Sequence, residues 1–122
     1  MARVLVIDDD EEHRTLVRQI LAKMGHETEE APNGAQGLRL FGKRRPDLVL
    51  TDINMPGLDG NDVISALRVM HANVPVIAIS GGGAIEKDEL LAKAASLGAV
   101  EVIVKPFEFR QLAGAVTRAL SR

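Results

Sequence analysis

The sequence predicts an α/β protein built on a doubly wound, five-stranded parallel sheet. Short runs with strand character alternate with segments of helical periodicity, and the alternation occurs five times along the chain. Three of the runs are almost continuously apolar, as expected for central parallel strands that are buried on both faces. Because crossovers between parallel strands are right-handed, such an alternation forms one sheet with helices on both sides.

The predicted strands differ in how clearly the sequence pattern indicates them. The first is apolar through VLVI and then enters three consecutive Asp residues, whereas the second is weak. The remaining three are bounded by turn residues or helical segments. In chain order, the predicted strands are Arg3–Asp9, His26–Ala31, Asp47–Ile53, Val74–Ser80 and Val100–Lys105.

The segments between the strands have the apolar spacing of amphipathic helices. Asp10 is placed to cap the start of the first helix and Gly25 its end. Asn61 is suited to cap the third helix, after a turn at Asp59 and Gly60, and the fourth runs roughly over Lys87–Leu97. Apolar faces are predicted for the first, second, third and fifth helices. In that order, they consist of Leu16, Val17, Ile20, Leu21 and Met24; Ala35, Leu38 and Phe41; Val63, Ile64, Leu67 and Met70; and Leu112, Val116 and Leu120.

Length and composition restrict the class of protein. The chain has 122 residues, which suits a single domain over 1–122, and we expect no output domain. The net charge of −2 comes from interspersed charges without the basic stripe that nucleic-acid binding needs. No apolar run approaches a membrane span, no signal-peptide pattern is present, and Cys is absent. We therefore expect a cytoplasmic protein, a monomer or weak dimer, that binds neither nucleic acid nor membrane directly.

Polar residues follow four of the predicted strands at the point where each strand ends. In doubly wound sheets the functional site lies at the carboxyl ends of the strands, where the strand order reverses. We therefore expect these side chains to converge on one edge of the sheet. They are Asp8, Asp9 and Asp10 after the first strand, Asp52 and Asn54 after the third, Ser80 at the end of the fourth, and Lys105 at the end of the fifth.

The cluster of carboxylates indicates a site for a cation and phosphate. Two like charges about 5 Å apart repel by roughly 3 kcal/mol at an effective dielectric constant near 20, so a cation would stabilise them. Mg²⁺ takes one or two carboxylates and leaves room for phosphate oxygens. A carboxylate beside Mg²⁺ can attack phosphorus, while the metal and a lysine offset charge and a hydroxyl donates a hydrogen bond.

Four stretches together resemble the receiver domain of two-component response regulators (CheY-like): VLVIDDD, LVLTDINMPGLDG, VPVIAISG and VIVKPF. The resemblance covers essentially the whole chain. It implies a flavodoxin-like (βα)5 fold with strand order 2-1-3-4-5 and a cis peptide bond before Pro106.

The resemblance also implies roles for the residues at the strand ends. Asp52 would be the phosphoacceptor, with Ser80 as the switch hydroxyl and Lys105 paired with the acceptor carboxylate or phosphoryl group. Asp8, Asp9, the Asp52 carboxylate and the backbone carbonyl of Asn54 would hold Mg²⁺. Asp10 is interpreted as a helix cap and not as a ligand.

The function implied is a phosphorylation-dependent signalling switch that is not an enzyme in the usual sense. A histidine kinase or phosphotransfer protein would supply the phosphoryl group, the domain would catalyse only its own phosphorylation and dephosphorylation, and binding to an unknown downstream protein would change. The alternative is a receiver-like interaction module that works without phosphorylation. It is disfavoured because Asp8, Asp9, Asp52, Ser80 and Lys105 are all present.

Two enzyme or cofactor classes are also disfavoured. A Mg²⁺-dependent phosphohydrolase with an aspartate nucleophile needs a second acid where this chain has Asn54, which cannot act as a general acid or base. A flavodoxin-type mononucleotide site would place phosphate after the first strand, where the carboxylates would repel it.

The chain departs from the family pattern at Val102, where relatives usually carry Tyr or Phe, and in a long segment after Ser80. Val102 has one side-chain torsion and little reach. We therefore expect the Gly81–Gly83 loop and the start of the fourth helix to respond to phosphorylation, with Val102 nearly fixed.

Several other residues are interpreted without a functional role. His13, His26 and His71 lie at polar helix or edge positions and are expected to be solvated. Met24 and Met70 are expected in the core.

Overall fold

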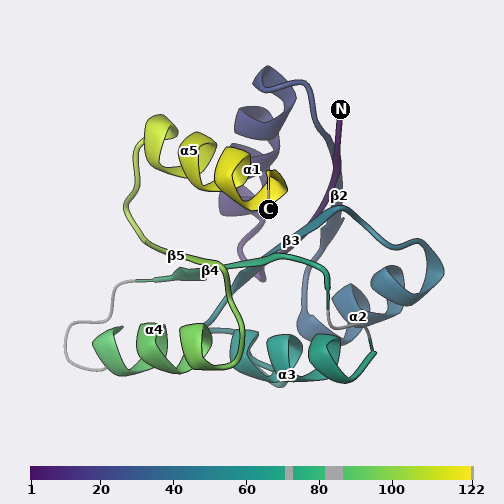
Figure 1. Cartoon of the computed structure of the whole chain (residues 1–122), viewed down its shortest axis with the longest axis vertical. Coiled ribbons are helices and arrows are strands. Elements are labelled where there is room, and N and C mark those ends of the chain that lie inside the picture. The colour runs from purple at the N-terminus through teal and green to yellow at the C-terminus, as the bar shows by residue number, and fades with distance from the viewer. Residues whose placement is uncertain (71–72, 82–86, 122) are drawn as a thin grey trace.

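The predicted architecture is confirmed by the structure, a computed structural model that describes residues 1–70, 73–81 and 87–121. Five parallel strands form one sheet in the order β2-β1-β3-β4-β5 (Figure 1). Each strand is slightly shorter than predicted. The strands are β1 (Arg3–Ile7), β2 (Glu27–Ala31), β3 (Leu48–Asp52), β4 (Val76–Ser80) and β5 (Glu101–Val104).

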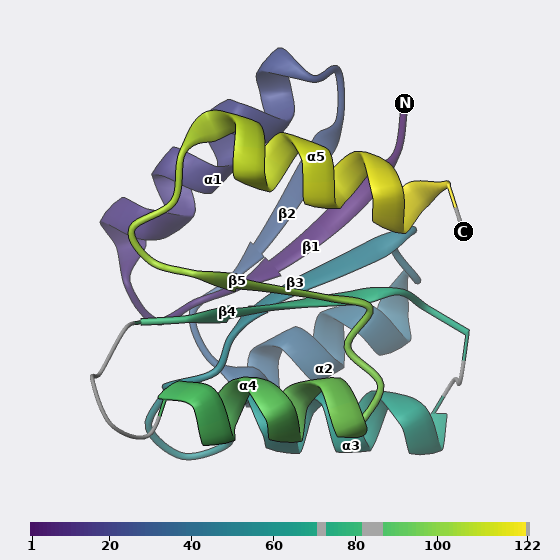
Figure 2. The same ribbon diagram turned by 60° about the vertical axis from the view of Figure 1, so that its left-hand side comes forward.

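Helices cover both faces of the sheet, as a doubly wound topology requires. Figure 2 shows α1 and α5 on one face and α2, α3 and α4 on the other. Within the described ranges, no helix combines the length and the apolar character needed to cross a membrane. The helices are α1 (Glu11–Lys23), α2 (Gly34–Lys43), α3 (Gly60–Met70), α4 (Lys87–Ser96) and α5 (Phe109–Leu120).

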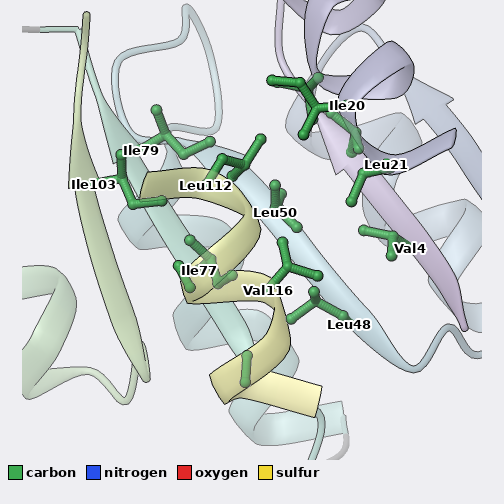
Figure 3. Packing of buried hydrophobic residues seen from close by; sticks show 14 residues of the cluster. Val4, Ile20, Leu21, Leu48, Leu50, Ile77, Ile79, Ile103, Leu112 and Val116 are labelled. Carbon is green, nitrogen blue, oxygen red and sulfur yellow. The ribbon is translucent and has the colours of Figure 1, made fainter. Parts of the chain in front are cut away.

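Alternating strand residues divide the core into two layers. On one face, Val4, Leu50 and Ile77 pack with buried residues of α1 and α5, including Val116 (Figure 3). On the other face, Leu5 and its alternating counterparts pack against α2, α3 and α4. Successive strand side chains point to opposite faces, so a strand with helices on both sides must be apolar throughout.

The ends of α1 follow the prediction. The Asp10 side chain accepts hydrogen bonds from the backbone N–H groups of Glu12 at 3.0 Å and His13 at 3.3 Å, as an N-cap does. Gly25 follows the helix with φ of 85°, a conformation that glycine adopts without steric cost. The peptide bond between Lys105 and Pro106 is cis, as expected.

The predicted cap of α3 is wrong. Asn61 is buried inside the helix, and the capping residue is Asp59. The Asp59 carboxylate accepts from the Asp62 N–H at 2.9 Å, and the Asp62 carboxylate accepts from the Asp59 N–H at 3.1 Å. This reciprocal arrangement satisfies two backbone donors at the start of the helix.

Three apolar residues assigned to helix faces are also more exposed than predicted, and one of them is Ala35 of α2, which is open to solvent. Leu16 is 47% exposed because the buried stripe of α1 runs through Val17, Ile20 and Leu21. Met70, the last residue of α3, is 44% exposed and so is not in the core. Met24 is partly buried against the α1 and α5 layer. Gly82, Gly83 and His71 lie outside the described residues, so the expectations for them are not tested.

Gly60 allows α3 to start directly against the end of β3. Its N–H donates to the carbonyl of Ile53 at 2.8 Å. A methyl group added at Gly60 would lie 2.6 Å from the Cα of Ile53, which is backbone and cannot rotate away. The absence of a side chain at Gly60 therefore helps to set the position of the loop that follows Asp52.

We predict that Gly60→Ala destabilises the protein by roughly 1–3 kcal/mol, because the added methyl group overpacks against backbone. Gly42→Ala is the matched control, since a methyl group there meets nothing within 4 Å on the exposed side of α2. It should leave stability unchanged or raise it by up to about 1 kcal/mol. Urea denaturation of both variants tests this, and a Gly60→Ala variant as stable as the control would contradict it.

Candidate functional site

The backbone ladder of the sheet continues past the strand ends and positions the predicted site. The N–H of Asp8 donates to Ala31 at 3.1 Å, that of Ile53 to Ile79 at 2.9 Å, and that of Lys105 to Ser80 at 2.9 Å. These bonds hold the residues after β1, β3 and β5 at a common edge. The expected convergence of these strand ends is therefore present in the structure.

Three carboxylates form the centre of this edge. Asp8, Asp9 and Asp52 each offer one oxygen, and these oxygens all lie within 4.8 Å of one another. Asp8 is 2% exposed and Asp52 is 5% exposed, whereas Asp9 is open to solvent. Opposite ligands of an octahedral Mg²⁺ are about 4.2 Å apart, so small side-chain movements would bring this set to the required geometry. The three residues fit a hard divalent cation.

Lys105 brings a positive charge to the same cluster. Its Nζ lies 3.0 Å from Oδ2 of Asp52, within hydrogen-bond distance, and 3.7 Å from Oδ2 of Asp8. The lysine comes from the end of β5 and reaches across the end of β4 to a residue on β3. It thus partly offsets two buried negative charges.

The pKa values of the two buried carboxyl groups shift in opposite directions. Burial raises the pKa of Asp52, and the charge of Asp8 adds to this, although the contact with Lys105 opposes it. Burial would also raise the pKa of Asp8, but the hydrogen bonds from His13 and the Asp10 N–H, with the charge of Lys105, bring it below its ordinary value. Asp8 is therefore the more firmly ionised of the pair.

Ser80 and Asn54 complete the predicted set. Ser80 is fully buried, and its hydroxyl has no hydrogen-bond partner among the described residues. Asn54 is exposed, and its backbone N–H donates to Oδ1 of Asp52 at 3.4 Å. A methyl group added at Gly81 would lie 3.8 Å from the Asn54 amide nitrogen, so the segments after β3 and β4 lie close together.

His13 is a site residue that the sequence interpretation missed. It was expected to be solvated, but its side chain is only 11% exposed and its Nδ1 contacts Oδ2 of Asp8. Its ring packs against Phe107 in a T-shaped arrangement, with ring centres 5.6 Å apart. Its neighbour Arg14 donates from Nη1 to the backbone carbonyl of Asp8 at 2.7 Å. The signal available in the sequence was the position of His13 in the first turn of a helix that follows Asp8.

His26, in contrast, is partly buried, and its Nδ1 accepts a hydrogen bond from the Ala2 N–H at 3.1 Å. It lies at the opposite edge of the sheet, before β2.

Residues 4–117 match the family described as the response regulator receiver domain. The chain belongs to this family. Among curated relatives, it is 33% identical over 118 residues to sporulation initiation phosphotransferase F of Bacillus subtilis, covering 97% of this chain and 93% of the relative. It is also 33% identical to the chemotaxis protein CheY of the same organism, with 98% of each chain covered.

Solved structures give the same result for the receiver fold. The receiver domain of NtrX from Brucella abortus superposes with a TM-score of 0.91 at 37% identity, covering 97% of this chain and 98% of that domain. Other relatives are longer than this chain. It spans half of the transcriptional regulatory protein PrrA of Mycobacterium tuberculosis, to which it is 39% identical over 98% of its own length.

The direction of the Asp52 shift predicts how stability depends on pH in the metal-free receiver. The folded state keeps the Asp52 proton to a higher pH than the unfolded state does, so protonation of Asp52 contributes to the free energy of unfolding. This contribution is fully present below the unfolded pKa, about 3.9. It is lost as pH rises through the folded pKa.

Asn does not titrate, so the Asp52→Asn variant does not lose this contribution. The free energy of unfolding of the variant, relative to that of the unchanged chain, should therefore increase as pH rises from about 4. Urea denaturation at several pH values, with a chelator present, measures the difference. Glu89→Gln, which removes an exposed carboxylate on α4, is the control. Curves for Asp52→Asn and the unchanged chain that stay parallel would contradict the prediction.

Proposed function

We propose that this receiver domain is a phosphorylation-dependent switch that accepts a phosphoryl group on Asp52. The observation that carries the proposal is the surroundings of Asp52: a lysine ammonium on one carboxylate oxygen, and two further carboxylates close enough to share a cation. A nucleophile, a fixed positive charge and a cation site are the components that phosphoryl transfer to a carboxylate requires.

The proposed donor is a phosphohistidine of a histidine kinase or phosphotransfer protein. A carboxylate oxygen of Asp52 attacks phosphorus, the new O–P bond forms, and the N–P bond to the donor imidazole breaks. The electron pair of that bond stays on the imidazole nitrogen, which takes a proton. Hydrolysis reverses the modification when water attacks phosphorus and the Asp52 carboxylate leaves.

Asp8, Asp9 and Asp52, with the backbone carbonyl of Asn54, would hold the Mg²⁺. When bound, this ion would offset charge on the phosphoryl oxygens and help to align them with the nucleophile. Asp9, the exposed carboxylate of the set, leaves the site open to solvent and to a donor protein.

Lys105 and Ser80 would act on the phosphoryl group itself. The Lys105 ammonium already contacts Asp52, so it can stabilise charge that develops on the attacking and transferred oxygens. The Ser80 hydroxyl, which has no hydrogen-bond partner among the described residues, can donate a charge-assisted hydrogen bond to a phosphoryl oxygen. A buried hydroxyl without a partner is costly, and the proposed bond would remove that cost once Asp52 is modified.

The relatives support a signalling role, since their names describe a phosphotransferase of sporulation initiation and a chemotaxis protein. We propose that phosphorylation changes binding to a downstream protein, that catalysis is limited to the domain's own modification, and that it acts in the cytoplasm. A module that works without phosphorylation would not need these polar residues together at one edge.

We predict that incubation with acetyl phosphate and Mg²⁺ adds the mass of one phosphoryl group, because Asp52 combines a buried strand-end position and a cation site with a lysine ammonium at hydrogen-bond distance, whereas that ammonium is 3.7 Å from Asp8. Asp52→Asn should abolish the gain. Asp47→Asn, at an exposed acid before β3, should keep it. Intact-protein mass spectrometry gives the answer, and a phosphorylated Asp52→Asn variant would overturn the assignment.

Mg²⁺ should stabilise the folded chain, because the three carboxylates are brought together only by folding. The expected gain is about 1.4 kcal/mol at a concentration ten times the Kd. Thermal unfolding during a Mg²⁺ titration measures it, and Asp9→Asn should remove most of the effect. A melting temperature that does not change up to millimolar Mg²⁺ would count against the cation site.

A further inference from the structure

His13 is directed at the site by the geometry of α1. It is the third residue of that helix, after the N-cap Asp10. Side chains on a helix lean toward its N-terminus, so the imidazole points back toward the end of β1. There its Nδ1 meets Oδ2 of Asp8. Because an ionised carboxylate only accepts hydrogen bonds, Nδ1 carries the hydrogen and donates it.

The imidazole is itself held in place. The Phe107 ring packs against it in a T-shaped arrangement, at an interplanar angle of 79°, and is also packed against the core layer under α1 and α5. The Nε2 atom of His13 is buried and has no hydrogen-bond partner in the part of the chain that the structure describes. The contact with Asp8 is therefore the polar interaction that orients this ring.

Asp8 is held at three separate atoms. Its Oδ1 accepts from the Asp10 N–H at 2.9 Å, its backbone carbonyl accepts from Arg14, and its Oδ2 accepts from His13. Lys105 is 3.7 Å from Oδ2, too far for a hydrogen bond. His13 therefore supplies the side-chain hydrogen bond that stops the carboxylate from turning, and each oxygen keeps a lone pair for another partner.

We propose that His13 is a positioning residue that fixes the Asp8 carboxylate in the orientation needed to bind the divalent cation. This inference rests on the proposed function, in which Asp8 is part of the cation site. Groups that hydrogen-bond to metal-ligating carboxylates fix their orientation, and their loss typically weakens metal binding 10- to 100-fold. His13 would act through Asp8 without touching the ion.

The test is isothermal titration of Mg²⁺ into the full chain, since the absence of Trp and Tyr leaves no strong intrinsic fluorescence to follow. His13→Leu keeps an apolar side chain against Phe107 but removes the donor, and should raise the Kd for Mg²⁺ by about tenfold or more. His13→Asn places an amide N–H at the same position along the side chain as Nδ1 and should recover most of the affinity. His26→Leu makes the same chemical change at the opposite edge of the sheet and should leave the Kd unchanged.

Circular dichroism and urea denaturation of each metal-free variant separate positioning from folding, because a purely structural role would not distinguish Asn from Leu in Mg²⁺ affinity once both are folded. If His13→Leu does not fold, His13→Met replaces it: it is apolar and unbranched, has no N–H donor and should lose the affinity that Asn keeps. Equal Kd values for the unchanged chain and the variant without the donor would overturn the proposed role of His13 but leave the proposed cation site intact. Absence of Mg²⁺ binding by the unchanged chain would overturn the proposed cation site as well.

Discussion

The burial of two carboxylates side by side is the constraint on which the arrangement of this edge depends. Removing an ionised carboxylate from water costs several kcal/mol unless charge and hydrogen bonds compensate. Asp8 and Asp52 come from the neighbouring strands β1 and β3, so parallel pairing places their charges together. Lys105, reaching from β5, supplies a fixed positive charge on Asp52. The strand order makes this possible, because β3 is central and β4 alone separates it from β5.

Much of the fold and the set of strand-end residues could be predicted from sequence because both depend on local patterns. Continuous apolar runs such as VLVI predict strands buried on both faces, and the carboxyl ends of parallel strands share one edge whatever the side chains between them. Asp8, Asp52 and Lys105 could therefore be grouped without knowing any distance. Family membership is confirmed, whereas the roles of these residues in phosphorylation remain our proposal.

The errors arose where the outcome depends on a helix boundary or on a contact distant in sequence. Asn61 was preferred as a cap over Asp59, but Gly60 lets α3 begin against the β3 backbone and moves the cap two residues earlier. His13 was assigned to solvent because its neighbours in the sequence are polar. Its burial depends on Phe107, which is far along the chain and joins it only in the folded protein.

The site residue Ser80 is joined to the neighbouring strand by a backbone hydrogen bond. The Ser80 hydroxyl has no partner in the part of the chain that the structure describes, and the Ser80 carbonyl accepts from the Lys105 N–H at 2.9 Å. Ser80 also pairs with Val104 in the β4–β5 register. If Ser80 moves toward a phosphoryl group on Asp52, the start of the β5–α5 connection must adjust with it or lose that hydrogen bond. Val102 is partly buried against the layer under α2, α3 and α4, and as a β-branched residue it has little rotational freedom. An output based on an aromatic ring at position 102 that swings inward is therefore not open to this chain, and displacement of the β4 end is the simpler route by which modification of Asp52 could alter its surface.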